Sequence, residues 1–173
     1  RHYEKLKTVE EYVRSGSQLT RQLLGLAKGG HRVIKTMNLN WLVKESSEVF
    51  GRTKKEIIVH RKLDEELWPV EADESQMEQA LLNMYVNAWQ AMKKGGNLHI
   101  ETKNVTLESD NALPYGLKGG RYVQVSIADC GSGMDKETMG KIFDPFFTTK
   151  ELGGGTGLGL ASVYTAIKDH DGT

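Results

Sequence analysis

The sequence has a single cysteine, Cys130, among its 173 residues. One thiol excludes an internal disulfide and a zinc site built from several cysteines, and it fits a reducing compartment such as the cytoplasm. No run of about 18 apolar residues is present, which excludes a membrane-spanning helix of ordinary length. We therefore expect a cytoplasmic chain without membrane contacts of its own, whether or not its parent protein is anchored in a membrane.

A net charge is also lacking, because 23 lysines and arginines balance 23 aspartates and glutamates. Without a basic surplus, nucleic acid is not an expected partner. The first residues are charged, unlike a signal peptide, and no methionine begins them, so we expect a piece of a longer protein. The residues that are present, 27% charged and 38% apolar, are typical of a globular domain with a core.

Residues 1–28 have the apolar spacing of a long amphipathic helix, which Gly29 and Gly30 end. No antiparallel partner follows it closely in the sequence. A helix of this kind usually packs on another chain or on a segment outside the sequence, and docking on its own domain is the alternative.

After residue 30, helical and strand patterns interleave. The strands at 98–107 and 121–129 are joined too directly for a helical crossover, so we expect them to be antiparallel. The predicted class is α+β, a two-layer sandwich of a mixed, mostly antiparallel sheet with helices on one face. The predicted helices are 39–50, 74–93, a short one after Asp135 and 158–169, and the other predicted strands are 57–61 and 68–72, the latter an edge strand because of its proline.

Two asparagines, Asn83 and Asn87, lie one turn apart on the helix predicted at 74–93 and so project from one face. Asparagine is a mediocre helix former, and partly buried amides need hydrogen-bond partners. A neutral amide oxygen can also bind a hard cation such as Mg²⁺. Taken alone, the pair fits a structural role and a metal site equally well.

Asp129 ends a predicted strand, and Gly131 and Gly133 follow it. A carboxylate at a strand end often only caps a turn, and for this segment alone that interpretation is favoured. The functional alternative is a buried acceptor for an amino group, with glycines that allow a flat ligand to approach the backbone.

Two further segments contain residues that a core does not need. Residues 143–147 hold three of the four phenylalanines, part of which we expect to plug the core, and Thr148 to Lys150 add hydroxyls and a cation. A glycine-rich stretch then leads into the helix predicted at 158–169, which favours an anion site at the helix N-terminus. The spacing matches neither a dinucleotide fold nor a P-loop. A flexible linker is disfavoured because the helix that follows is apolar enough to pack.

In this order, the four segments resemble the boxes of the ATP-binding domain of sensor histidine kinases, in the superfamily shared with gyrase, heat-shock chaperones and mismatch-repair ATPases. The resemblance covers about residues 35–173 and implies a Bergerat-type ATP-binding fold preceded by one long helix. It divides the chain into residues 1–30, part of the second helix of a dimerisation and phosphoacceptor hairpin, and residues 31–173, an ATP-binding catalytic domain shortened at its C-terminal end.

The resemblance implies that Asp129 accepts a hydrogen bond from the adenine amine and that Asn83 and Asn87 hold Mg²⁺ on the phosphates. Residues 146–155 would form a mobile lid over ATP. The remaining nucleotide contacts that it implies are Ala88, Gly131, Gly133, Met134, Thr148, Lys150, Gly155, Gly157, Leu158, Gly159 and Leu160.

The implied reaction passes the γ-phosphoryl group of ATP to a histidine on the dimerisation helices and then to an aspartate of a response regulator. The implied partners are a second copy, bound through the N-terminal helix, and a receiver domain. No catalytic residue is expected in this chain, whose domain positions ATP and neutralises charge.

Two positions depart from the family pattern. The phosphoacceptor motif, a histidine followed by an acidic residue, is matched only by His170, which is in the wrong place and should cap the last helix instead. We therefore expect no autophosphorylation of this chain. Gln90 stands where many family members carry lysine or arginine, and Lys93 or Lys94 are possible replacements.

The residues disfavour three rival functions. A hydrolytic ATPase of the superfamily would need a glutamate at the position of Asn83, because an amide cannot act as a base. A protein-serine kinase of the anti-sigma type would share the asparagines and glycines, but the phenylalanine-rich segment and the N-terminal helix disfavour it. A degenerate scaffold without enzymatic activity is disfavoured because all four boxes are intact.

Overall fold

The computed structural model describes residues 33–150 and 155–173. The helix predicted at 1–28 and part of the glycine-rich stretch lie outside these residues. The elements are β1 (Ile34–Met37), α2 (Leu39–Thr53), β2 (Ile57–Leu63), β3 (Val70–Asp73), α3 (Glu74–Ala91), β4 (Gly96–Leu107), α4 (Ser109–Ala112), the 3₁₀ turn η1 (Leu113–Tyr115), β5 (Gly120–Asp129), α5 (Lys136–Met139) and α6 (Gly159–Lys168).

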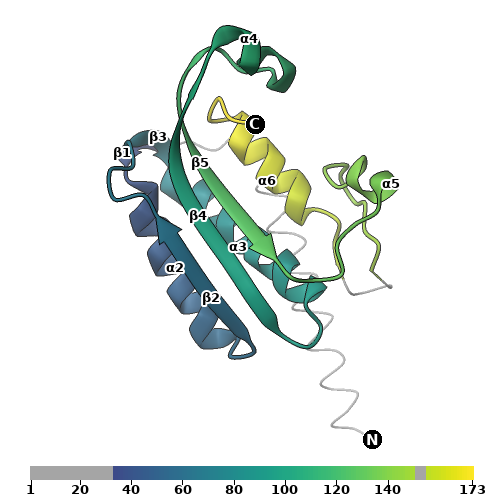
Figure 1. Cartoon of the computed structure of the whole chain (residues 1–173). Coiled ribbons are helices and arrows are strands. Elements are labelled where there is room, and N and C mark those ends of the chain that lie inside the picture. Colours follow the sequence, from purple (N-terminus) through teal and green to yellow (C-terminus); the bar gives the residue numbers. More distant parts are fainter. Residues whose placement is uncertain (1–32, 151–154) are drawn as a thin grey trace, which may run out of the picture.

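The main sheet has the strand order β2-β4-β5. Strand β2 runs parallel to β4. Strands β4 and β5 are antiparallel, as predicted, and their register pairs Ile100 with Ile127. Strands β1 and β3 form a separate antiparallel pair. Helix α3 packs on α2, β5 and α6 (Figure 1). The mixed sheet with its layer of helices confirms the predicted α+β class.

The helices start where the sequence predicts. The Asn38 side chain accepts a hydrogen bond from Asn40 N (2.8 Å) at the start of α2, and Asp73 caps α3 by accepting from Gln76 N (3.1 Å). One face of α3 then enters the core against Leu98 and Ile100 of β4. Its buried residues are Met77, Ala80, Leu81, Tyr85 and Ala88.

Some local predictions differ from the structure. Strand β1 was not predicted, because three of its four residues are exposed and give no alternating apolar pattern. Strand β4 begins at Gly96, two residues before the predicted start at residue 98, and α4 and η1 lie between β4 and β5. Strand β3 begins one residue after Pro69. Among the described residues, no helix is both long and apolar enough to cross a membrane.

Candidate functional site

The two asparagines of α3 face the first turn of α6. Asn83 Nδ2 donates to the Gly159 carbonyl oxygen (3.2 Å), and Asn83 Oδ1 accepts from Gln79 Nε2 (3.1 Å). A Cβ atom built on Gly159 would lie 3.7 Å from Asn87 Nδ2 and 4.0 Å from Asn83 Cγ. Both amides therefore project from one face of α3, as their spacing predicts.

The first glycine box, which is the segment from Asp129 to Gly133, lies against the same helix, one turn beyond Asn87. Ser132 N donates to the Ala91 carbonyl oxygen (3.4 Å), and a Cβ on Gly131 would lie only 2.6 Å from Ala91 Cβ. Position 131 must therefore be glycine for the loop to approach α3 this closely. Because residues 83, 87 and 91 are four apart, α3 brings the asparagines and this box onto one face.

Asp129 is attached to this loop rather than buried beneath it. Its Oδ1 accepts a hydrogen bond from Gly131 N (2.8 Å), which is the turn-capping arrangement that the sequence favoured. The side chain is exposed, so the structure shows the favoured turn cap and not the buried acceptor of the alternative. Met134 is 54% exposed, and a Cβ on Gly133, whose φ is +68°, would meet nothing within 4 Å. This end of the site is open to a flat ligand.

The phenylalanine box, Phe143 to Phe147, is joined to the second glycine box, Gly155 to Gly159, by a backbone hydrogen bond. Phe146 N donates to the Gly157 carbonyl oxygen (3.0 Å), with φ angles of +68° at Phe146 and +67° at Gly157. Phe143 packs against Tyr164 of α6, with ring centroids 5.2 Å apart. Phe143 and Phe146 are 46% and 64% exposed, so the predicted plug over the core is wrong for these two side chains. Phe143 lies on the outside of α6 against Tyr164 instead.

The start of α6 is anchored by Leu158, which is completely buried. Gly159 begins the helix, and Leu160 is partly buried beside it. The first turn of a helix leaves amide N–H groups without intrahelical acceptors, and their dipoles favour an anion. Because Asn83 holds the Gly159 carbonyl, this turn sits directly beside the asparagine face of α3.

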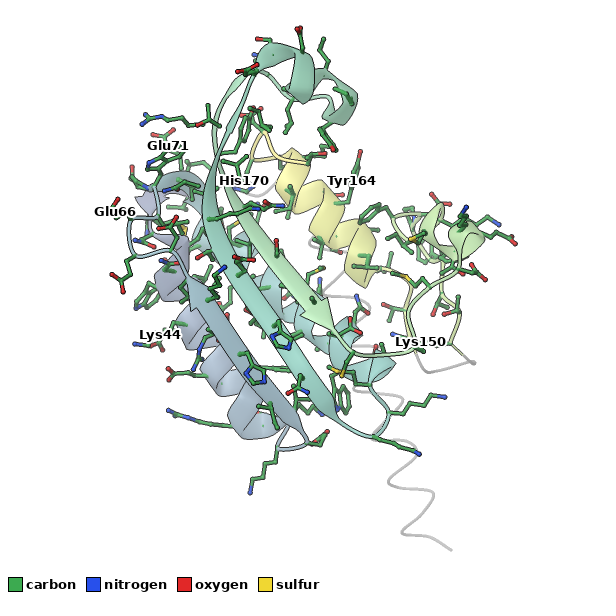
Figure 2. The ribbon with its side chains drawn as sticks, viewed as in Figure 1. Lys44, Glu66, Glu71, Lys150, Tyr164 and His170 are labelled. Atoms are coloured by element: carbon green, nitrogen blue, oxygen red, sulfur yellow. The ribbon has the colours of Figure 1, made fainter. Side chains whose placement is uncertain are left out.

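Lys150 connects the phenylalanine box to α3 (Figure 2). Its ammonium donates to Gln90 Oε1 and to Asn87 Oδ1 (3.5 Å). Its backbone N donates to Thr148 Oγ1 (3.2 Å), and a Cβ on Gly155 would lie 3.1 Å from both Lys150 Cδ and Thr148 Oγ1. Burial lowers the pKa of the Lys150 amine. Among the described residues, Lys150 rather than Lys93 or Lys94 meets Gln90, which the sequence did not reveal.

Ala88, a predicted nucleotide contact, and His170, the predicted cap of α6, both lie away from the exposed surface around the asparagines. The Ala88 side chain is 4% exposed and belongs to the core, so its contact with a ligand would have to use the backbone. His170 lies at the far end of α6, where its Nε2 accepts from Asp73 N (3.0 Å) and its Nδ1 therefore donates to the Ala166 carbonyl oxygen (2.6 Å). The predicted cap of α6 by His170 is confirmed.

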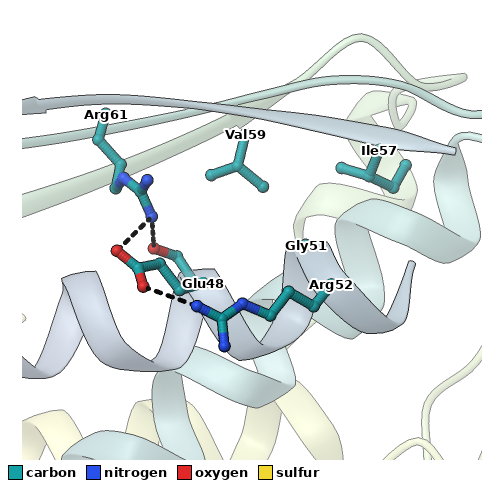
Figure 3. A pocket seen from close by; sticks show the side chains of 7 residues that line it. Glu48, Gly51, Arg52, Ile57, Val59 and Arg61 are labelled. Carbon is teal, nitrogen blue, oxygen red and sulfur yellow. Dashed lines mark hydrogen bonds and ion pairs between the residues drawn. The ribbon is translucent and has the colours of Figure 1, made fainter. Parts of the chain in front are cut away.

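Two pockets lie beside this face rather than on it. One, of about 390 Å³, is lined by Glu56, Trp89, Gln90, Met92, Lys93 and Lys150. The other, of about 330 Å³, lies between α2 and β2, where Glu48 pairs with Arg61 (4.0 Å) and Arg52 (3.6 Å) (Figure 3). Neither is lined by Asn83, Asn87 or Asp129. Lys150 and Gln90 lie at the edge of the first pocket, whereas Asp129 and Met134 are exposed at the other end of the surface that the four boxes form along α3.

The family described as histidine kinase-, DNA gyrase B-, and HSP90-like ATPase matches residues 72–173. Sensor kinase CckA of Brucella abortus (strain 2308) is 34% identical over 169 residues, which cover 96% of this chain and 18% of CckA. Signal transduction histidine-protein kinase AtoS of Escherichia coli (strain K12) is 35% identical over 173 residues, 99% of this chain and 26% of AtoS. The chain thus spans about a fifth to a quarter of these relatives.

Solved structures agree with the sequence relatives. The catalytic domain of histidine kinase ThkA has a TM-score of 0.63 and 31% identity, covering 79% of this chain and 81% of that chain. ThkA in complex with response regulator protein TrrA has a TM-score of 0.64 and 25% identity, covering 92% of this chain and 43% of that chain. The fold predicted from the sequence therefore matches that of histidine kinase catalytic domains.

Proposed function

Because the chain belongs to the family of histidine kinase-, DNA gyrase B- and HSP90-like ATPases, we propose that the shared face of α3 and α6 binds Mg²⁺-ATP for a two-component sensor histidine kinase. The observation that carries this proposal is the convergence of all four boxes on one helix, α3. Asn83 and Asn87 face Gly159, Gly131 packs on Ala91, and Lys150 reaches Asn87.

Asp129 reads the adenine amine in this proposal. The bond from Gly131 N holds Oδ1 of this exposed carboxylate in place. A carboxylate accepts hydrogen bonds only, so it selects a base with an amino group at that edge. Gly133 and Met134 border the open space that the base would enter.

The phosphates lie between α3 and the start of α6. The backbone of Gly155, Gly157, Leu158, Gly159 and Leu160 offers donors to them at a helix N-terminus, with Thr148 and Ala88 at the margins. Mg²⁺ keeps few protein ligands and shares phosphate oxygens, and when bound it neutralises their charge. The residues fit such an ion at Asn87, whose Oδ1 already accepts from one cation, the Lys150 ammonium. Asn83 would be a second ligand, through the Oδ1 that accepts a hydrogen bond from Gln79 in this structure.

The phosphoryl group passes to a histidine outside this chain and onward to a receiver aspartate, so that the domain itself supplies position and charge. The ThkA–TrrA complex supports a response regulator as the partner. A second copy, bound through residues 1–28, and a cytoplasmic location belong to the same proposal. Hydrolysis is disfavoured, because Asn83 offers an amide where a base would stand.

Calorimetric titration with Mg²⁺-ATP tests this proposal. The wild-type chain should bind with a dissociation constant between micromolar and sub-millimolar, and Asp129→Asn should weaken binding at least about tenfold, as expected for a lost charge-assisted hydrogen bond. Asn keeps an oxygen for Gly131 N, so the loop stays formed.

The matched control is Asp110→Asn, an exposed carboxylate on α4 at the far end of the β4–β5 hairpin (Figure 1). It should bind like the wild type. A folded wild-type sample that takes up no nucleotide would end the proposal.

A further inference from the structure

Gln90 is three residues beyond Asn87 on α3 and therefore beside it on the helix surface. Its side-chain oxygen accepts a hydrogen bond from the Lys150 ammonium, which also donates to Asn87 Oδ1 (3.5 Å). The contact joins residues 60 apart in the sequence. It places a glutamine, a residue type with no charge of its own, at the point where the Lys150 ammonium meets the asparagine face.

The lysine is held at several points along its length. Its backbone N donates to Thr148, its stem lies beside Gly155, and its ammonium lies between two amide oxygens. A long lysine side chain loses considerable rotamer entropy when it is fixed, so such a position requires good acceptors. A neutral amide holds the ammonium without cancelling its charge, whereas a carboxylate would cancel it.

The two acceptors differ in what happens when nucleotide arrives. If Asn87 Oδ1 binds Mg²⁺, the ammonium must leave that oxygen, because two cations at one acceptor repel each other strongly at such short range. Gln90 Oε1 is then the acceptor that remains on α3 for Lys150. Without it, the ammonium would lose its remaining acceptor on α3.

We propose that Gln90 is a positioning residue, which holds the Lys150 ammonium beside the metal and phosphates of the bound nucleotide. The inference rests on the proposed function, because it presumes a nucleotide on this face of α3. Gln90 has no charge, but its contact with Lys150 brings a positive charge to this part of α3. Neither Lys93 nor Lys94 is needed to supply that charge.

The test is a double-mutant cycle measured by calorimetry with Mg²⁺-ATP. Gln90→Ala should weaken binding about tenfold or more, in line with the loss of a hydrogen bond to a charged group. Lys150→Met should weaken it at least as much. The double variant should bind no more weakly than Lys150→Met, because Gln90 acts only through the lysine. Gln90→Glu should also weaken binding, since its carboxylate holds the ammonium but cancels the charge.

Glu78→Ala, at an exposed position of the same helix, is the control and should bind like the wild type. A merely structural role for Gln90 would make its substitution equally harmful with and without Lys150, so additive losses overturn the inference. Wild-type affinity in Gln90→Ala beside weakened binding in Lys150→Met overturns it too, and leaves the proposed function standing. A wild-type chain that binds no nucleotide removes both.

Discussion

At the scale of single residues, Gly157 leaves no room for a side chain beside the Phe146 backbone. Gly157 has a φ of +67°, and a Cβ there would lie 2.3 Å from the Phe146 carbonyl carbon. Phe146 itself has a φ of +68°, an uncommon conformation for a bulky residue. Strain of this kind is held in place by surrounding contacts and concentrates at functional sites. Here the hydrogen bond from Phe146 N to the Gly157 carbonyl oxygen keeps the phenylalanine box against the turn that starts α6.

Substitution of Gly157 by alanine tests that contact. The left-handed backbone costs about 1–2 kcal/mol for a residue with a Cβ, and the clash with Phe146 adds to it. Gly116→Ala is the matched control, because Gly116 has the same φ of +67° with nothing within 4 Å of its Cβ position. Urea unfolding should show a clearly larger loss of stability for Gly157→Ala. Equal losses in the two variants would show that the backbone alone matters and that the Phe146 contact does not.

At the scale of elements, Asp73 ties three segments together. Its carboxylate accepts from Val33 N (2.8 Å) and caps α3 through Gln76 N (3.1 Å), while its backbone N–H donates to His170 beyond the end of α6. The bond from the Ser75 hydroxyl, opposed by burial and aided by backbone bonds, holds the pKa of Asp73 below its usual value. The charged form is therefore favoured by folding.

Asp73→Ala should cost about 1–2 kcal/mol of unfolding free energy near neutral pH, the usual effect of losing a helix N-cap. Because the folded-state pKa lies below the unfolded value of about 3.9, this contribution is complete above that pH and disappears as the pH falls through the folded pKa. Urea unfolding at pH 7 and at pH values below 4 should thus show the two proteins converging in acid. A difference in stability that does not change with pH would contradict this assignment. Asp135→Ala, which caps only the four-residue α5, should cost less.

The sequence predicted the elements that have strong periodicity or clear caps, and missed those that depend on distant contacts. Helices α2, α3 and α6 and the antiparallel pair of β4 and β5 follow from local patterns. Strand β1 is defined by its pairing with β3, which nothing in its own residues indicates. The sequence did not indicate that Phe143 is exposed, because a phenylalanine that packs on the outside of α6 cannot be told from a core phenylalanine by residue type. The Lys150–Gln90 contact joins residues too far apart in sequence for any spacing to reveal.

At the scale of the whole molecule, α3 has two functions on adjacent faces. Its buried face, including Tyr85 and Ala88, forms the core with the sheet, while Asn83, Asn87 and Ala91 face α6 and the first glycine box. A site built on a helix that is itself packed into the core is held more accurately than one built on loops alone. Asn83 and Gly159 are 76 residues apart in the sequence. Packing on α3 explains how they and the other two boxes meet on one surface.

The most direct test of this arrangement is to follow the backbone amide NMR signals of the ¹⁵N-labelled chain during titration with Mg²⁺-ATP. The account predicts that the shifted signals come from residues 83–91, 129–134, 146–150 and 155–160 together, while the residues around Glu48 and Arg61 in the cleft between α2 and β2 keep their positions. Shifts confined to that cleft, or to only one of the four boxes, would contradict the claim that α3 gathers them into a single nucleotide site.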